Sequence, residues 1–532
     1  MDARADLPPV DWDHAVGHPD RRRILAMMCG CLIMVVAGVS SLNVAIPTIV
    51  SDLDASQTEQ LWILDAYALV FAGLLLPAGA LGDRFGRRRA LLTGLAIFGT
   101  ASLVATRVGD PLQLIALRAA MGSGAALIMP ATLSIITTVF PPVERGKAIA
   151  TWAGMSAAGG ALGPLASGLL LERFWWGSIF FINTPIVVLV VIGVLRFVPE
   201  VTATREPEPL DPVGSILSIV GLTSVVLAII EGPEWGWTSG RTLGVATVGV
   251  LVLVGFVAWE LRSSDPMLDP RLFRIRRFAI GAATITLAFL VLFGSFYIFT
   301  LYLQFARGHS ALGAAVRMLP FPVTMILVAP RSPKIVARIG DRATVAVGFG
   351  LQTFGFVLAS QFDLTTPYLY MAATFSCLAL GMAMMMPPTT AAIVASLPES
   401  KAGVGSAVND TTREVGGAVG IAMLGSLLST GYRDAFGDRL GAGAEALPET
   451  ARELAGDSIA GAAVVAERLG GDAAQALADA AASAYIEGLG LAFTVAAVIA
   501  FASAVGVTTF YPRGSDDMPS DLDLTVPREA RR

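Results

Sequence analysis

The sequence predicts an all-α integral membrane protein of fourteen transmembrane helices, arranged as two six-helix halves with two further helices inserted between them. Three observations support this fold class. Of the 532 residues, 54% are hydrophobic and only 15% are charged, whereas a soluble protein carries about 25% charged residues. Apolar runs long enough to cross a bilayer recur fourteen times. A short basic motif occupies a matching place in each half.

The same composition excludes several other classes of protein. A net charge of -5 is unlike that of a nucleic-acid binder. The three cysteines, Cys29, Cys31 and Cys377, lie in apolar runs and are interpreted as packing residues rather than metal or redox groups. No P-loop, H-E-x-x-H or G-x-S-x-G pattern is present, and no soluble segment is large enough for an active site. We therefore expect neither an enzyme nor a direct ATP-driven pump.

The fourteen spans follow from length, because about 20 apolar residues are needed to cross the hydrocarbon. The tenth, which contains Arg317, Pro320 and Pro322, is the least regular. The runs cover 24–47, 61–81, 90–106, 112–138, 147–171, 176–198, 211–230, 242–260, 278–303, 311–330, 343–360, 367–388, 403–430 and 486–509.

Positive residues predict the orientation, since Lys and Arg collect on the cytoplasmic side. Arg21, Arg22 and Arg23 precede the first span, which has no cleavage pattern and should stay attached. With the N-terminus inside, 26 of the 37 Lys and Arg lie on the cytoplasmic side. We expect a multi-pass protein of the bacterial inner membrane with both termini cytoplasmic.

The spans divide the chain into a tail (1–23), a first half (24–198), an inserted pair with its linkers (199–277), a second half (278–509) and a tail (510–532). Within the second half, the acidic, Ala-rich segment 432–484 is too polar to cross and is predicted to be external. Its helix-prone stretches, 449–469 and 472–486, leave two alternatives open. It forms a helical cap, or it is a solvated loop.

An internal repeat relates the two halves. Gly-Asp-Arg occurs after the second span (82–84) and again after the tenth (340–342), each time in an expected basic cytoplasmic loop. Two similar halves around a midplane site are the architecture of alternating access.

The first copy of this motif is the more specific. It follows the pattern G-x-L-x-D-R-x-G-R-[KR]-R, and in this it resembles the major facilitator superfamily, which implies the major facilitator fold. Its glycines allow a tight turn, and Asp83 can accept from a helix N-terminus or an arginine and so latch one conformation. The matching residues are Gly79, Asp83, Arg84, Gly86, Arg87, Arg88 and Arg89.

Two further motifs resemble the same superfamily. In the fourth span, Arg118 with Leu114 and Gly122 is similar to a motif whose arginine is associated with proton coupling, although Met121 replaces the usual Gln. The alternative is a structural pairing of that arginine. In the fifth span, an antiporter-like motif comprises Gly159, Gly163, Pro164 and Gly168. The alternative there is ordinary close packing of membrane helices.

Fourteen spans with these motifs resemble the drug:proton antiporter branch, and within it the QacA-type multidrug exporters. Residues 61–67 and 263–269 strengthen that resemblance. It implies an exporter of lipophilic cations, such as quaternary ammonium compounds and dyes, driven by the proton gradient without a cofactor. We also expect a monomer. One departure is Gly38, which stands where the subfamily commonly has an Asp.

Carboxylates are the candidates for the coupling proton, because His14, His18 and His309 lie outside the spans or at their edges. We expect Asp65, Asp410 and Glu414 to bind protons and cationic drug in competition. Asp410 and Glu414 lie four residues apart, on one helical face, near Asn409 and Arg413.

Two aromatic residues flank Asp65. Trp62 and Tyr67 could offer π faces to a cation, although Trp62 could equally anchor its helix at the interface. Asp65 itself could be only an acid at a helix end. A proton-coupled importer is disfavoured by the antiporter-like motif, and an exporter of a single antibiotic or metabolite remains open.

Overall fold

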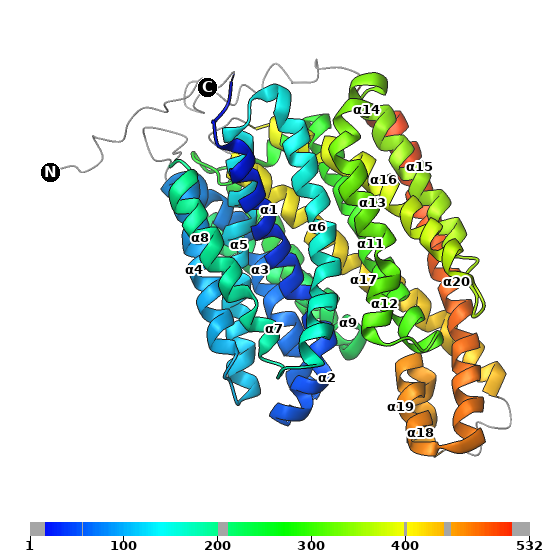
Figure 1. The fold of residues 1–532 in the computed structure, drawn as a ribbon. Helices are drawn as coiled ribbons and strands as arrows, with labels where there is room; N and C mark the ends of the chain where they lie inside the picture. The colour runs from blue at the N-terminus through cyan, green and yellow to red at the C-terminus, as the bar shows by residue number, and fades with distance from the viewer. Residues whose placement is uncertain (1–15, 56, 201–210, 398–401, 441–447, 513–532) are drawn as a thin grey trace.

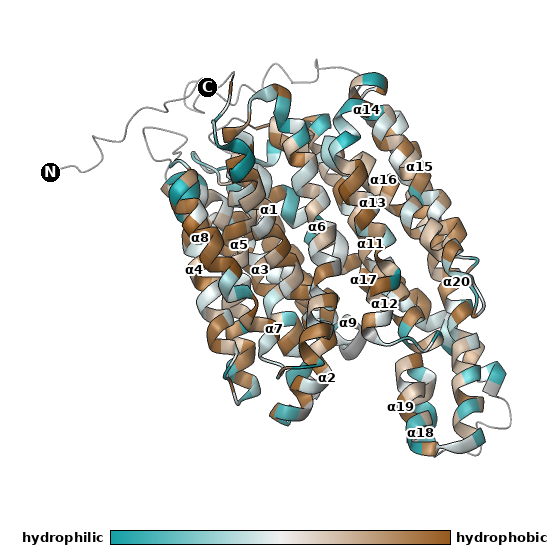
Figure 2. Cartoon of the chain, in the orientation of Figure 1, coloured by the Kyte–Doolittle hydropathy of each residue, from teal (hydrophilic) through white to brown (hydrophobic). Residues whose placement is uncertain are grey.

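The computed structural model describes residues 16–55, 57–200, 211–397, 402–440 and 448–512, and within these ranges it is helical with no strand. Fourteen of its helices are long and apolar enough to cross a membrane. This confirms the predicted fold class. The helices stand side by side in one bundle (Figure 1). Hydrophobic residues occupy the middle of the bundle, and hydrophilic ones gather towards its two ends (Figure 2).

The first half begins with two consecutive helices, α1 and α2. Ser41 separates them and itself keeps helical backbone angles. The sixth span is likewise divided, between α7 and α8. The elements are α1 (Arg21–Ser40), α2 (Leu42–Leu53), α3 (Gln57–Phe85), α4 (Arg87–Ala105), α5 (Pro111–Val139), α6 (Pro142–Leu171), α7 (Ser178–Phe181) and α8 (Asn183–Phe197).

The inserted pair is a helical hairpin of α9 (Pro212–Trp235) and α10 (Gly240–Glu260). Asp211 caps α9 through the amide of Gly214 at 2.7 Å and accepts the indole N–H of Trp259 at 2.9 Å. These bonds fix the start of one helix to the end of the other. α9 also packs against α3 and α17, and so contacts both halves.

The second half repeats the pattern with more interruptions. The tenth span, predicted to be irregular, is divided into α12, α13, η3 and α14, with Pro320 and Pro333 in the first turns of α13 and α14. The elements are η1 (Pro270–Arg274), α11 (Arg276–Leu301), η2 (Tyr302–Ala306), α12 (Ala311–Met318), α13 (Pro320–Val328), η3 (Ala329–Arg331), α14 (Ser332–Ile339), α15 (Asp341–Ala359), α16 (Tyr368–Ala395), α17 (Ala402–Leu440), α18 (Glu449–Asp457), α19 (Ile459–Leu469) and α20 (Gly471–Phe510).

The two basic motifs correct one expectation, because neither forms a loop. α3 continues to Phe85 and α4 begins at Arg87, so Gly86 alone, at φ 101°, separates them. Gly340, at φ 81°, does the same between α14 and α15. Glycine adopts positive φ readily, so a single residue turns the chain and both helices keep their full length.

The segment between the last two spans is largely helical where the structure describes it. α17 and α20 extend into it beyond the predicted span ends, and α18 and α19 form a short hairpin against them. The hydroxyl of Tyr432 on α17 donates to the carbonyl of buried Ala455 on α18 at 2.7 Å. The helical cap, rather than the solvated loop, describes these residues.

α1 begins and α20 ends at the same end of the bundle (Figure 1), which we call the terminal end. Here Arg21 pairs with Glu144 of α6 at 2.8 Å, and Arg277 of α11 pairs with Asp341 of α15 at 2.6 Å. The cap α18–α19 lies at the opposite end.

Candidate functional site

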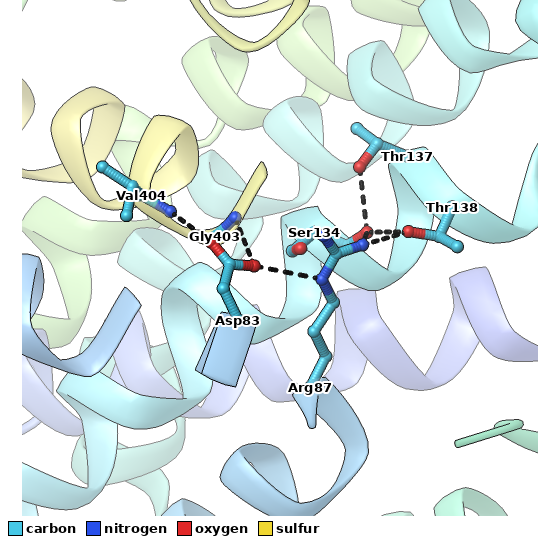
Figure 3. Close-up of polar contacts among 7 residues, drawn as sticks. All are labelled: Asp83, Arg87, Ser134, Thr137, Thr138, Gly403 and Val404. Carbon is cyan, nitrogen blue, oxygen red and sulfur yellow. Dashed lines mark hydrogen bonds and ion pairs between the residues drawn. The ribbon is translucent and has the colours of Figure 1, made fainter. Parts of the chain in front are cut away.

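The two halves meet at the terminal end through Asp83, near the end of α3. Its carboxylate accepts hydrogen bonds from the backbone amides of Gly403 at 3.0 Å and Val404 at 3.1 Å, in the first turn of α17 (Figure 3). The first amides of a helix lack partners within it and carry partial positive charge. An ionised carboxylate of one half therefore caps a helix of the other.

Arg87 extends this contact into the first half. Its guanidinium, 3% exposed, lies 3.3 Å from Asp83 and donates to the Ser134 carbonyl of α5 at 3.4 Å. It also donates to the hydroxyl of Thr138. The hydroxyls of Thr137 and Thr138 donate to the same Ser134 carbonyl (Figure 3). One network thus connects α3, α4, α5 and α17.

Close helix packing places Asp83 within reach of α17. A Cβ at Gly79 would lie 2.6 Å from the Gly403 carbonyl oxygen and 2.8 Å from the Cβ of Ala407. Such distances are too short for any side chain, so glycine is required there.

Two further arginines of the motif, Arg84 and Arg88, make other contacts as well. Arg88 donates to the Leu195 carbonyl of α8 at 2.8 Å. Arg84 lies over the Phe85 ring at 5.3 Å. Gly79, Asp83 and Arg87 of the motif meet at the contact between the halves.

A second polar region lies deeper in the bundle, around Arg118 of α5. Arg118 is 1% exposed and donates to three backbone carbonyls, of Ile63 at 3.0 Å, Gly38 at 3.2 Å and Leu64 at 3.4 Å. Its guanidinium also lies 4.7 Å from the centre of the Tyr67 ring. Fixed backbone oxygens and an aromatic face hold this charge in place.

Gly38 contributes its carbonyl to Arg118, whereas a side chain there would point elsewhere. A Cβ at Gly38 would contact the Phe98 ring of α4 at 3.4 Å. The position that differs from the QacA-type pattern thus touches the arginine through its backbone.

The three candidate residues on α3 do not all face the same neighbouring helix. Tyr67 is buried and donates to the Val35 carbonyl of α1 at 3.3 Å. Trp62 packs against a small apolar cluster of Leu69, Ala72 and Val226 between α3 and α9. Asp65 is half-buried, within electrostatic reach of Arg118, and continues the helical stripe of Leu69 and Ala72.

The second half contributes a polar cluster from α17. Asp410 is fully buried and accepts the Asn409 side-chain amide at 3.3 Å. Asn409 in turn accepts the hydroxyl of Thr390 on α16 at 3.0 Å. Arg413, 3% exposed, lies 3.4 Å from Glu414 and 5.5 Å from the Phe289 ring centre on α11.

The α17 acids face the first half. Gly403 and Ala407 contact Gly79 of α3, and positions 410 and 414 continue the same stripe at helical spacing. Tyr67 lies within electrostatic reach of Arg118, Arg413 and Glu414. Counting outward from Gly79 along the two helices, Asp65 stands about 7 Å beyond Glu414. Asp410 and Glu414 therefore lie on the α17 face towards the first half, whereas Asp65 lies in a neighbouring layer, on the α3 stripe that packs against α9.

The antiporter-like residues of α6 pack against two neighbours. A Cβ at Gly159 would lie 3.0 Å from the Ile33 carbonyl of α1, and one at Gly163 would lie 2.8 Å from that of Ala37. Gly168 instead faces Leu312 of α12, in the second half, at 3.5 Å. Pro164 lies inside the helix.

Sequence reasoning named Arg413 as a charged in-span candidate and Asn409 only as a neighbour of the acids, and it missed Thr390 and Phe289. It also missed Glu231 and Glu260, buried carboxylates of the inserted pair. Rare charges in or beside apolar runs were the available signal for Arg413, Glu231 and Glu260. A phenylalanine or threonine in an apolar run carries no such signal.

The histidines lie away from these layers, as expected for the two that the structure describes. Burial lowers the pKa of His18, before α1. Burial and the charges of Arg317 and Arg307 lower the pKa of His309, between η2 and α12. His14 lies outside the described residues.

A cavity of about 420 Å³ opens at the terminal end between α6 and the second half. The Arg277–Asp341 ion pair, Gly146 and Pro333 are part of its wall. None of the predicted site residues lines it.

Comparisons with known sequences agree with this architecture. The family model of the Major Facilitator Superfamily matches residues 28–421. The tetracenomycin C resistance and export protein of Streptomyces glaucescens is 32% identical, over 95% of this chain and 94% of its own. The multidrug efflux pump LfrA of Mycolicibacterium smegmatis is 34% identical, over 92% and 96%. The methyl viologen resistance protein SmvA of Salmonella typhimurium is 36% identical, over 88% and 93%.

Solved structures share the fold. The human organic anion transporter MFSD10 (TETRAN) superposes with a TM-score of 0.62 at 13% identity, covering 92% of this chain and all of that one. A peptide transporter, POT, gives 0.55 at 16% identity, covering 93% and 97%. Together with fourteen apolar helices and the Asp83 contact between two halves, these matches establish that the chain is a multi-pass membrane transporter belonging to the Major Facilitator Superfamily.

Proposed function

We propose that this transporter exports lipophilic cationic drugs, such as quaternary ammonium compounds and dyes, in exchange for protons by alternating access. The observation that carries the proposal is the acid pair of α17, in which Asp410 is fully buried and the side chain of Glu414 is 21% exposed. Asp410 and Glu414 face the first half, where Tyr67, Arg118 and Asp65 lie. Buried carboxylates in a membrane bundle attract either a proton or a cation, and the two compete for the same oxygens.

Relatives support drug export as the activity. LfrA is a multidrug efflux pump, and SmvA confers resistance to methyl viologen. A second candidate function has support of its own, since other relatives are resistance proteins for tetracenomycin C and puromycin. In that case the chain would export one antibiotic or metabolite, and the acids would carry protons only.

The proposed cycle uses the contact at the terminal end as its latch. While Asp83 caps α17, the halves stay together there, and the acid layers exchange protons and drug with the opposite side. Releasing Asp83 lets the terminal end open, so that the proton leaves and another drug binds. Each elementary charge moved across the membrane is worth about 2.3 kcal/mol per 100 mV, which drives such a cycle without a cofactor.

Orientation and assembly are part of the same proposal. Arginine-rich motifs at the terminal end support a cytoplasmic location for it by the positive-inside rule, and in the proposed orientation export runs towards the cap. We propose a monomer in a bacterial inner membrane, because one chain supplies both halves and the polar layers between them.

Ethidium efflux tests this function most directly. Cells expressing the chain should extrude ethidium, and a protonophore should abolish the extrusion. Asp410→Asn and Glu414→Gln should each lower efflux at least about tenfold, because each removes a carboxylate from the exchange. Glu453→Gln, in exposed residues of the cap, is the matched control and should leave efflux unchanged.

Other outcomes reject the proposal. Efflux that persists with a protonophore contradicts proton exchange. Expressed, folded protein that moves no cation, yet protects cells against a single antibiotic, favours the second candidate.

A further inference from the structure

The two buried arginines deeper in the bundle, Arg118 and Arg413, differ in how far their hydrogen-bonding capacity is used. Arg118 donates to three carbonyls and lies over a ring. Arg413 makes one side-chain bond, to Glu414 at 3.4 Å. Its Nε and Nη1 are buried without a hydrogen-bond partner among the described residues. A guanidinium has five N–H donors, so Arg413 keeps unused capacity beside the acid pair.

Asp410 is incomplete in the same way. Its Oδ1 accepts only the Asn409 amide, and its Oδ2 is buried with no partner among the described residues. Asp410 and Arg413 are three residues apart, on adjacent turns of α17. Unused donors of Arg413 and an unused acceptor of Asp410 thus lie on adjacent turns of the same helix. This arrangement can admit a further charged group without first breaking a saturated network.

We propose that Arg413 is a resident counter-charge of the carboxylate site, which limits uptake to one positive charge at a time and so determines which cations are preferred. This deepens the proposed cation–proton exchange and rests on it. Arg413 is a specificity-determining residue rather than the proton carrier, because its guanidinium stays charged.

Counting the charges of the α17 cluster leads to this limit. Asp410 and Glu414 supply two negative charges when ionised, and Arg413 supplies one positive charge. One negative charge is left, which a single proton or one monovalent cation neutralises. Without Arg413 two would be left, and the layer would then suit a dication. Uncompensated charge is costly in a medium of low polarity, so this difference should decide affinity.

The position of Arg413 explains why it can act as a fixed charge. Phe289 lies beneath its guanidinium, and an aromatic face stabilises a cation without neutralising it. The bond to Glu414 is long for a charge-assisted hydrogen bond, which is typically about 2.7–2.9 Å. Arg413 therefore lowers the charge of the pair while leaving carboxylate oxygens for a ligand.

Ethidium and propidium provide the test, since they share one ring system and carry one and two positive charges. Binding of each dye to the purified full-length protein is measured by fluorescence anisotropy. The wild type should bind ethidium more tightly. Arg413→Gln should raise the affinity ratio of propidium to ethidium by about tenfold or more, because a unit charge is removed at contact distance. Arg413→Lys, which keeps the charge, should preserve the wild-type ratio.

Charge-restoring variants keep the test independent of the single arginine variant. Glu414→Gln brings the count to zero and should weaken both dyes. The double variant Arg413→Gln/Glu414→Gln returns the count to one negative charge and should recover ethidium binding and the ethidium preference. Arg317→Gln, whose guanidinium donates to the Gly313 carbonyl on α12, is the matched control.

The outcomes separate the two proposals. An unchanged ratio in Arg413→Gln, a double variant that binds no better than Glu414→Gln, or a wild type that prefers propidium overturns the role of Arg413. Dye binding without proton-driven uptake into proteoliposomes contradicts the proposed exchange instead, and leaves the charge limit to be judged by the binding ratios alone.

Discussion

The carboxylate of Asp83 lies 3.0 Å from the backbone amide of Gly403, a residue 320 positions later in the chain. The contact joins the end of a helix in one half to the beginning of a helix in the other. Because the Gly403 amide belongs to the first turn of α17, the bond needs no particular side chain from that half. It depends on the charge of Asp83 and on the close approach of α3.

Asp83→Asn should weaken the contact at the terminal end. An amide oxygen accepts hydrogen bonds without a full charge, and bonds to a charged group contribute roughly 1.5–3 kcal/mol. We expect transport to fall about tenfold. Spin labels at Arg196 and Arg338, on exposed sites of the two halves, should show a broader and longer distance distribution by pulsed electron resonance.

Arg89→Gln is the control for that experiment. Arg89 belongs to the same basic motif, but its side chain is 65% exposed and 3.8 Å from Glu200, where an ion pair contributes little. If Arg89→Gln changes the distances as much as Asp83→Asn does, the effect belongs to general charge at the terminal end.

Gly79→Ala should stop transport while leaving the isolated halves intact. A methyl group would lie 2.6 Å from the Gly403 carbonyl oxygen, and overpacking of this kind costs about 1–3 kcal/mol. Thermal unfolding in detergent and dye transport measure the two effects. Gly350→Ala, at a helical position with open space around it, should be neutral or stabilising. Equal transport in both variants would refute the close-approach argument.

Arg118→Lys should be nearly as damaging as Arg118→Met. Lysine keeps the positive charge, but its single nitrogen cannot reproduce the planar fork that reaches the Ile63 and Gly38 carbonyls. We expect a loss of about 2–4 kcal/mol in stability, as for a buried charged group that loses partners. Differential scanning fluorimetry measures it. Full stability in Arg118→Lys would mean that charge alone matters.

Tyr432→Phe should loosen the cap without altering transport. It removes the hydroxyl that donates to Ala455 at 2.7 Å, at a cost of about 1 kcal/mol. Hydrogen exchange of residues 449–469 should accelerate, while that of α3 should not. Arg433→Gln, the exposed neighbour on α17, should change neither. A loss of dye transport in Tyr432→Phe would show that the cap takes part in the cycle.

Hydrophobic length predicted the fold well, because every span has to satisfy its own backbone in lipid and therefore has to be a helix. The breaks between helices were harder. Arg87 and Asp341 were expected in loops, but a glycine at positive φ lets helices begin at both residues. Where along the chain one glycine can replace a loop depends on packing that hydropathy does not report.

The candidate site, too, could be predicted only in part from the sequence. Motif spacing predicted that Asp83 accepts hydrogen bonds from a helix N-terminus or an arginine, and the structure supplies these partners, of which the backbone amides of α17 have no sequence signature. Trp62 and Tyr67 flank Asp65 in sequence, yet one packs towards α9 and the other lies over Arg118. Neighbours in a helix point in different directions, so assigning them to one pocket required the positions of other helices.

The halves meet along two sides of the bundle, and the inserted pair covers only one of these sides from the bilayer. On one side, α9 lies against both α3 and α17, with Leu222 and Val226 buried. On the other, α6 meets α13 directly, and Leu162, Val323 and Leu327 on those helices remain exposed. A lipid-dissolved molecule diffusing in the plane of the membrane thus finds one flank shielded by protein and the other bordered only by acyl chains. Lateral access from the bilayer therefore differs between the two sides of the protein, although its halves repeat one pattern.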